Sequence, residues 1–278
     1  MNEILSIKEI INSYDNFIID QWGVMHNGSI GYKYAIETIN LLNEKNKNLF
    51  IISNSSKRQN SSYEKLTSYG YRKESFKNIL TSGEMIWNYL HNKHLNDINK
   101  KKCLHIFDAS KEDGLDFRNG LNLDYTDDIE NAELILACTP FIEMEPIDYI
   151  PMLNIALQKN LIMYCANPDF ETVEMGSNNN IFCMGAVAEI YNKMGGRVII
   201  KGKPEKDIYI ETTKSFDIDK KRTLAIGDSL FHDIKGANNF SIDSVLVKSG
   251  IHKENDIIDK LIKNHQILPT YSINKFKI

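Results

Sequence analysis

The stretch that decides the fold is Phe17–Val24, with the sequence FIIDQWGV. Its first three residues are apolar, the fourth is Asp20, and Gly23 allows a sharp turn soon after. Open α/β sheets present reactive groups in this way, because the carboxyl ends of their buried parallel strands open into a crevice. The stretch therefore predicts a strand that ends at Asp20, with the carboxylate at the edge of a sheet.

Apolar segments of strand length alternate with amphipathic segments of helix length around this stretch. Apolar residues at helical spacing predict a helix over 32–46, and the run 49–52 predicts the next strand. The same patterns predict helices over 57–69 and 84–94 and strands at 79–81, 198–200, 223–226 and 244–247. This alternation indicates an α/β protein with a doubly wound, mainly parallel, Rossmann-like sheet and right-handed crossovers.

The strand and helix rhythm begins again near residue 100. Strands are predicted over 103–107, 134–137 and 161–165, helices over 147–159 and 185–194, loops over 108–128 and a polar turn at 177–180. Gly195 and Gly196 end the second helix and suit a hinge. We therefore expect a core domain formed by 1–97 and 196–278, with 98–195 inserted as a second α/β domain.

Composition places the chain among ordinary globular proteins. Hydrophobic residues make up 42% and charged residues 25% of its 278 residues, and the length favours two compact domains. The net charge of -4 argues against nucleic acid as a partner. No apolar run approaches the ~20 residues that span a bilayer, and the opening residues lack a secretory apolar segment. Widely spaced cysteines indicate reduced thiols, so we expect a cytoplasmic protein without a membrane partner.

Polar side chains follow four of the predicted core strands, where a parallel sheet would expose them together. They are Asp20, Ser53 with Asn54, Lys203, and Asp228 with Asp233 five positions later. Carboxylate oxygens are preferred ligands of Mg²⁺, and an ammonium group and a metal ion both offset the negative charge of phosphoryl transfer. An aspartate can also act as the nucleophile and form an aspartyl-phosphate.

In this order and spacing, the segments resemble the four motifs of the haloacid dehalogenase (HAD) superfamily. The matching residues are Asp20-x-x-Gly23-Val24, Ile52-Ser53-Asn54-Ser55-Ser56, Thr81-Ser82-Gly83, Asn167-Pro168-Asp169, Gly202-Lys203-Pro204 and Gly227-Asp228-(x)4-Asp233. The resemblance spans about residues 15–251 and is greatest to the class IIA branch, whose nitrophenylphosphatase-like members carry a large α/β cap between the second and third motifs. It implies a Mg²⁺-dependent hydrolase, a phosphatase acting on a small phosphorylated metabolite, and it makes a homodimer possible.

The same resemblance implies a role for each matching residue. Asp20 would be the nucleophile and a metal ligand, with the backbone carbonyl of Trp22 and the carboxylate of Asp228 as further ligands. Asp233 would support the metal. Three other sets would act on the substrate: Ser53 and the Asn54 amide would bind phosphoryl oxygens, Lys203 would neutralise Asp20 and the phosphate, and the loop with Asn167 and Asp169 would hang from the cap over the site.

Position 22 departs from the family pattern. Phosphatases of the superfamily usually carry a second aspartate there, which protonates the leaving group, whereas this chain has Trp22. A general acid contributes roughly 10²–10⁴-fold in rate. Three alternatives follow: the leaving group departs unaided, as from an acyl or aryl phosphate; another group such as His26 is the acid; or the reaction breaks a bond other than a phosphomonoester.

Simpler interpretations exist for the same residues. Asp228, Asp233 and Ser53 could each belong to the start of a helix, and His26 could be a packing histidine. Trp22 could pack against the cap and shape the substrate pocket. A catalytically impaired protein that binds phosphate or a metabolite is therefore the alternative function. A nicotinamide-dependent dehydrogenase is excluded, because the chain has no G-x-G-x-x-G.

Overall fold

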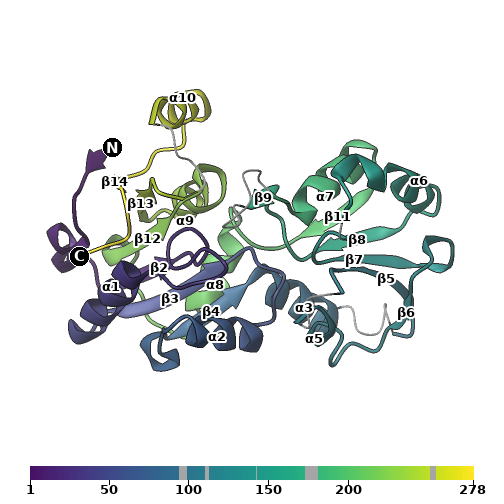
Figure 1. Cartoon of the computed structure of the whole chain (residues 1–278), viewed down its shortest axis with the longest axis horizontal. Coiled ribbons are helices and arrows are strands. Elements are labelled where there is room, and N and C mark those ends of the chain that lie inside the picture. The colour runs from purple at the N-terminus through teal and green to yellow at the C-terminus, as the bar shows by residue number, and fades with distance from the viewer. Residues whose placement is uncertain (94–98, 110–112, 142, 173–180, 251–254) are drawn as a thin grey trace.

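The computed structural model contains two parallel sheets that lie side by side (Figure 1). It describes residues 1–93, 99–109, 113–141, 143–172, 181–250 and 255–278. Both chain termini lie at the larger sheet, away from the smaller one (Figure 1). The structure confirms the predicted α/β class with a doubly wound, parallel, Rossmann-like core.

The larger sheet has seven strands, and every neighbouring pair is parallel. Its strands in spatial order are β1 (Asn2–Glu3), β14 (Tyr271–Ile273), β13 (Asp243–Val247), β12 (Thr223–Gly227), β2 (Asn16–Ile19), β3 (Asn48–Ser53) and β4 (Asn78–Thr81). The chain order reverses at β2, which has β3 on one side and β12 on the other. Ligands bind at such a reversal in α/β sheets, outside the carboxyl ends of the strands.

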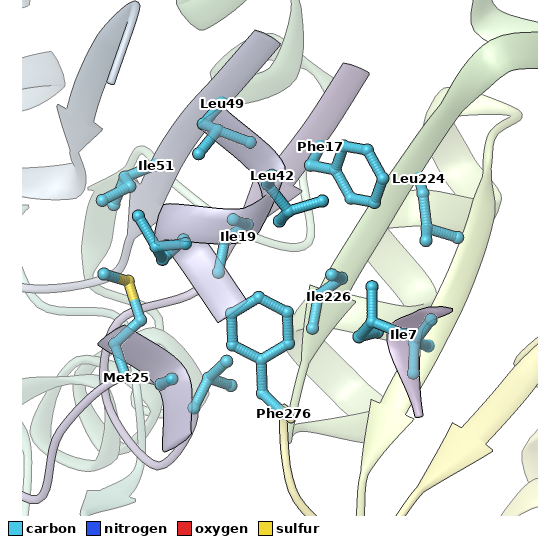
Figure 2. Close-up of a cluster of buried hydrophobic side chains, with 14 of the residues drawn as sticks. Ile7, Phe17, Ile19, Met25, Leu42, Leu49, Ile51, Leu224, Ile226 and Phe276 are labelled. Atoms are coloured by element: carbon cyan, nitrogen blue, oxygen red, sulfur yellow. The ribbon is translucent and has the colours of Figure 1, made fainter. Parts of the chain in front are cut away.

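Alternate residues of β2 enter different apolar cores on the two faces of the large sheet. Phe17 and Ile19 pack with Leu42 and Phe276 on one face, as Figure 2 shows, whereas Ile18 belongs to the core on the other. Helices α1 (Lys33–Glu44) and α2 (Gln59–Ser68) contribute to the first core, and α8 (Lys206–Thr213) and α9 (Lys235–Phe240) contribute to the second. Each large apolar side chain buried in this way contributes about 1.5–3 kcal/mol to folding stability, so packing on both faces fixes β2 at the centre of the sheet.

The smaller sheet has five parallel strands. They are β11 (Arg197–Ile200), β8 (Ile162–Cys165), β7 (Leu134–Ala137), β5 (Lys102–Ile106) and β6 (Asp124–Thr126). Side chains of α6 (Ile150–Gln158) and α7 (Met184–Lys193) pack in the core on one face, and Ile86 and Leu90 of α3 (Ser82–Lys93) pack in the core on the other. The other α-helices and strands in the described residues are α5 (Asp113–Asp116), α10 (Asn255–His265) and the antiparallel pair β9 (Glu171–Thr172) and β10 (Ile181–Phe182).

The structure differs from two expectations about the segments around the smaller sheet. The strand predicted at 198–200 was assigned to the core, but β11 pairs with β8 in the five-stranded sheet. The segment 108–128, predicted as loops, contains the short helix α5 and the edge strand β6. Sequence pattern alone does not distinguish the sheets, because both are built from short apolar parallel strands.

We propose that the chain returns to the core after β11, at Lys201-Gly202, rather than at residue 196. The other expected boundary, at residue 97, and the turn predicted at 177–180 lie outside the described residues. None of the helices in the described part of the chain has the length and apolar character needed to span a bilayer.

Candidate active site

A cavity of about 280 Å³ lies at the carboxyl edge of the large sheet. Its lining brings together six residues that the sequence predicted from separate segments: Asp20, Ser53, Asn54, Lys203, Asp228 and Asp233. Asp20 directly follows β2, Ser53 ends β3, and Asp228 directly follows β12. The convergence follows from the topology, because these three strands are neighbours and all run in the same direction.

Lys203 connects two of the carboxylates. Its Nζ atom donates hydrogen bonds to Oδ1 of Asp20 and to Oδ1 of Asp233, each at 2.7 Å. All three side chains are at least nine-tenths buried. The backbone N–H of Ser229 also donates to Oδ2 of Asp233 at 3.0 Å. Both oxygens of Asp233 are thus hydrogen-bonded within the protein.

The charges in this buried group do not balance. Asp20, Asp228 and Asp233 each offer a ligand oxygen, and these oxygens lie within 4.8 Å of one another. Burial raises the pKa of Asp20 to about 7, against the opposing effect of the Lys203 ammonium. For Lys203, burial alone would lower the pKa, but Asp20 and Asp233 raise it well above its usual value. Three carboxylates facing one ammonium group leave an excess of negative charge, which suits a divalent cation.

Glycines give these carboxylates the room to converge. Gly23 has φ +75°, and a Cβ atom there would overlap Oδ2 of Asp228. A Cβ atom at Gly227 would overlap the carboxylate of Asp233, and one at Gly250 would overlap that of Asp228. Gly23 is therefore required both by the turn and by the closeness of the Asp228 carboxylate, which follows the neighbouring strand β12.

The side chain of Asn54 holds the backbone at Lys203 with two hydrogen bonds. Oδ1 of Asn54 accepts from the backbone N–H of Lys203 at 2.8 Å, and Nδ2 donates to the Lys203 carbonyl at 3.1 Å. Nδ2 also donates to Oδ1 of Asp169, in the loop that follows β8 of the smaller sheet, at 2.8 Å. The sequence predicted a role for the backbone amide of Asn54 but gave no signal for this side-chain network.

The loop with Asn167 and Asp169 reaches the cavity from the smaller sheet, but only Asp169 lines it. Oδ1 of Asn167 accepts from the backbone N–H of Asp169 at 3.3 Å, so Asn167 shapes the turn. Oδ1 of Asp169 lies 3.0 Å from Nδ1 of His232. Burial would by itself raise the pKa of Asp169 and lower that of His232; their attraction instead lowers the first and raises the second.

Trp22 lines the cavity, whereas His26 is a packing residue. The rings of Trp22 and His26 meet edge to face at 5.4 Å, and a Cβ atom at Gly28 would overlap the indole. His26 is 5% exposed, and its Nδ1 accepts from the backbone N–H of Gly28 at 3.1 Å. Burial lowers the pKa of His26 to about 4. The described residues that line the cavity do not include His26, so the geometry does not place it as an acid.

Comparison with known proteins identifies the family of this fold and site. The family model described as haloacid dehalogenase-like hydrolase matches residues 17–116, and a model described as HAD-hydrolase-like matches residues 200–273. The chain belongs to the haloacid dehalogenase-like hydrolases. Like other members of this family, it is therefore a hydrolase, as its sequence motifs predicted.

Relatives of this HAD-like hydrolase match it over nearly its whole length. A 4-nitrophenylphosphatase from Schizosaccharomyces pombe is 25% identical over 96% of this chain and 93% of its own. The crystal structure of a haloacid dehalogenase-like hydrolase from Brucella suis is 26% identical, with a TM-score of 0.82 over 98% of this chain and 99% of that one. A possible sugar phosphatase from Cytophaga hutchinsonii, 20% identical with a TM-score of 0.76 over 100% of this chain and 99% of its own, shares the fold.

Sequence reasoning missed several residues that line the cavity of this HAD-like hydrolase. They include His232, Tyr32, Asn27 and Glu171. His232 lies in the single helical turn Leu230–Ile234 that directly follows Asp228 and Ser229, so its place beside Asp233 was a signal that could have been used. Tyr32, just before α1, lies in a segment where no motif points to the site, whereas Glu171, on β9, lies two residues after the Asn167-Pro168-Asp169 motif.

Proposed function

We propose that this protein is a Mg²⁺-dependent phosphatase that hydrolyses a small phosphorylated metabolite through an aspartyl-phosphate on Asp20. The observation that carries the proposal is the buried group in which Lys203 donates to both Asp20 and Asp233 while Asp228 lies beside them. That one relative, from Schizosaccharomyces pombe, is a 4-nitrophenylphosphatase agrees with this reaction.

The residues present fit a Mg²⁺ ion. Their donor atoms are carboxylate oxygens, which this hard cation prefers. The negative charge of the three carboxylates is larger than the positive charge of the Lys203 ammonium among them. Asp20 and Asp228 would hold the ion together with the backbone carbonyl of Trp22. Asp233 would support the ion less directly, because its oxygens already accept hydrogen bonds from Lys203 and Ser229. When bound, the ion would offset charge on the phosphoryl oxygens.

The side chains around Asp20 supply the remaining parts of a phosphoryl transfer. A carboxylate oxygen of Asp20 attacks phosphorus, the bond to the ester oxygen breaks, and that oxygen leaves with its electron pair. Ser53 and the backbone amide of Asn54 bind the phosphoryl oxygens, while the Lys203 ammonium stabilises the negative charge. Water then attacks the phosphorus of the aspartyl-phosphate, which releases phosphate and restores the Asp20 carboxylate.

Trp22 limits the kind of leaving group that this site serves well. An indole donates a hydrogen bond but does not act as a general acid near neutral pH, so the side chain at position 22 cannot protonate a departing alkoxide. We therefore propose that the preferred substrate has a leaving group that is stable as an anion, such as a phenolate or a carboxylate. Aryl and acyl phosphates meet this requirement.

The decisive experiment is a Mg²⁺-supplemented screen of aryl, acyl and alkyl phosphates, with the Asp20→Asn protein in parallel. The proposal predicts turnover of activated phosphates that needs Mg²⁺ and falls by at least about 10³-fold in Asp20→Asn. Phosphate release no faster than the Asp20→Asn background across the whole panel would refute it.

A second candidate function is binding without efficient turnover. The observation that favours it is Trp22, which is held between His26 and Gly28 where the superfamily usually has an acid. This candidate predicts that phosphorylated metabolites raise the melting temperature of the protein but are not hydrolysed. The same panel, read by thermal shift as well as by phosphate release, distinguishes the two functions.

A further inference from the structure

The backbone around Asp169 is fixed to the smaller domain. The carbonyl of Asp169 accepts from the N–H of Gly185 at 3.1 Å, and the carbonyl of Phe170 accepts from the N–H of Cys183 at 2.8 Å. A Cβ atom at Gly185 would overlap the carbonyl of Pro168. The loop therefore lies directly on the first turn of α7, which packs against the five-stranded sheet. In its backbone contacts, Asp169 belongs to the smaller domain.

The side chain of Asp169 instead contacts the larger domain. Its Oδ1 accepts from Nδ2 of Asn54 at 2.8 Å and lies 3.0 Å from Nδ1 of His232. Because an ionised carboxylate only accepts hydrogen bonds, the hydrogen of His232 must lie on Nδ1, and this bond forms whether the ring is neutral or charged. Asn54 follows β3 and His232 follows β12, so the carboxylate bridges two separate strands of the large sheet.

Asn54 extends the bridge to Lys203. The amide group that donates to Asp169 also forms two hydrogen bonds with the Lys203 backbone. The Lys203 ammonium in turn contacts Asp20. A chain of hydrogen bonds therefore runs from the cap loop, through Asn54, to the residue that neutralises the proposed nucleophile.

The charge of Asp169 argues against direct contact with the substrate phosphate. A carboxylate beside a phosphate dianion is repelled, and Asp169 already has two partners from the larger domain. Glu171, two residues further on, lines the same cavity, and its side chain has no hydrogen bond or ion pair within the described part of the chain. The two carboxylates of the loop thus differ in their contacts, and only Asp169 joins the domains.

We propose that Asp169 is a positioning residue whose contacts with Asn54 and His232 latch the cap loop over Asp20. Its effect on catalysis rests on the proposed phosphatase function, whereas its effect on the loop does not. Loss of the latch frees the loop, so the substrate is held less well while the chemistry at Asp20 remains.

Hydrogen exchange of the backbone amides of residues 166, 167 and 169–171 tests the latch in protein without substrate. His232→Phe removes one hydrogen bond of the Asp169 carboxylate and should speed exchange about tenfold, whereas Asp169→Ala removes the contacts with both His232 and Asn54 and should speed exchange at least as much. Because Asp169→Ala already removes the contact with His232, the double variant should exchange no faster than Asp169→Ala. Asp169→Asn keeps an acceptor oxygen and should restore slow exchange. Glu171→Ala is the matched control and should leave exchange in this segment unchanged.

Kinetics with 4-nitrophenyl phosphate and Mg²⁺ provide the second readout. His232→Phe should raise KM about tenfold and Asp169→Ala at least as much, each with kcat changed by less than about threefold, and the double variant should match Asp169→Ala. Exchange that stays slow in both single variants would overturn the latch, and so would a double variant whose effects multiply. If Asp169→Ala does not fold, His232→Phe and Asp169→Asn test the latch in its place. Absence of turnover in the unmodified protein would refute the proposed function, while hydrogen exchange would still decide the latch.

Discussion

Nζ of Lys203 lies 2.7 Å from Oδ1 of Asp20, and both side chains are buried. The two residues are 183 positions apart in the chain, because the strands of the five-stranded sheet lie between them in the sequence. The same ammonium donates to Asp233, so one positive charge faces a group of three carboxylates. We therefore expect the stability of the site to depend on Lys203 and, under the proposed function, on a bound cation.

Removing the Lys203 ammonium should leave buried carboxylates without compensation. We expect Lys203→Met to lower the free energy of unfolding by about 3 kcal/mol, and Mg²⁺ to raise the melting temperature of this variant more than that of the unmodified protein. Lys201→Met is the matched control, since Nζ of Lys201 lies 3.7 Å from an exposed carboxylate of Asp207 and should contribute below about 1 kcal/mol. Urea unfolding with and without Mg²⁺ measures both effects. Equal losses in the two variants would contradict the assignment of a buried charge group.

Replacing Gly23 should weaken metal binding through Asp228. An alanine there would be strained at φ +75° and would push its Cβ atom into Oδ2 of Asp228. We expect Gly23→Ala to raise the Mg²⁺ concentration for half-maximal activity about 10- to 100-fold. Gly195→Ala is the control, because Gly195 has φ +93° but no atom within 4 Å of the added Cβ. If both variants have the same Mg²⁺ dependence, Asp228 is not the affected ligand.

A carboxyl group at position 22 should restore proton donation to the leaving group. For a simple alkyl phosphate we expect Trp22→Asp to increase kcat at least about tenfold, within the 10²–10⁴-fold range of a positioned acid. For 4-nitrophenyl phosphate the change should be smaller, because nitrophenolate leaves without protonation. Trp22→Asn removes the same indole but adds no acid, so an equal gain in that variant would rule out proton donation as the reason.

A buried histidine in the smaller domain should make folding stability depend on pH. Nδ1 of His105 accepts from Nε of Arg118 at 3.2 Å, and Nε2 lies 3.3 Å from Sγ of Cys138. Burial, with the nearby charge of Arg118, lowers the pKa of His105 to about 3 from the usual 6.5. Between these values the unfolded chain binds a proton that the folded protein excludes, so stability falls as pH decreases below 6.5.

The size of this effect follows from the two pKa values. The His105 contribution should reach about 2 kcal/mol between pH 6.5 and pH 5, at about 1.4 kcal/mol per pH unit. Urea midpoints at pH 7 and pH 5 measure the loss, and His105→Gln should reduce the difference between them. An unchanged difference would show that His105 is not protonated on unfolding in this range.

The sequence predicted which segments meet at the site, because a polar residue after an apolar strand lies at a sheet edge whatever the rest of the fold. Asp20, Ser53 and Asp228 lie at the carboxyl ends of neighbouring strands and line one cavity, as expected. The strand before Lys203 was assigned to the wrong sheet, since its pairing with β8 depends on contacts between distant segments. The roles of the site residues, a homodimer and a cytoplasmic location stay predictions.

Side-chain partners could not be predicted in the same way. His232 owes its ion-pair contact to the carboxylate of Asp169, which the loop after β8 of the smaller sheet brings to 3.0 Å. His26 follows the first motif closely, yet it packs between Trp22 and Tyr69. Motif spacing predicts which backbone segments meet at the site. The contact of one side chain with another depends on the packing of the whole fold.

The central claim is that Asp20 carries the phosphoryl group, and trapping that group tests it most directly. The protein would be mixed with excess 4-nitrophenyl phosphate and Mg²⁺, quenched in acid within one turnover, digested and examined by mass spectrometry. We predict a phosphoryl group on the peptide that contains Asp20, and none on that peptide from Asp20→Asn. Turnover that persists in Asp20→Asn, or a phosphoryl group on another residue, would contradict the account.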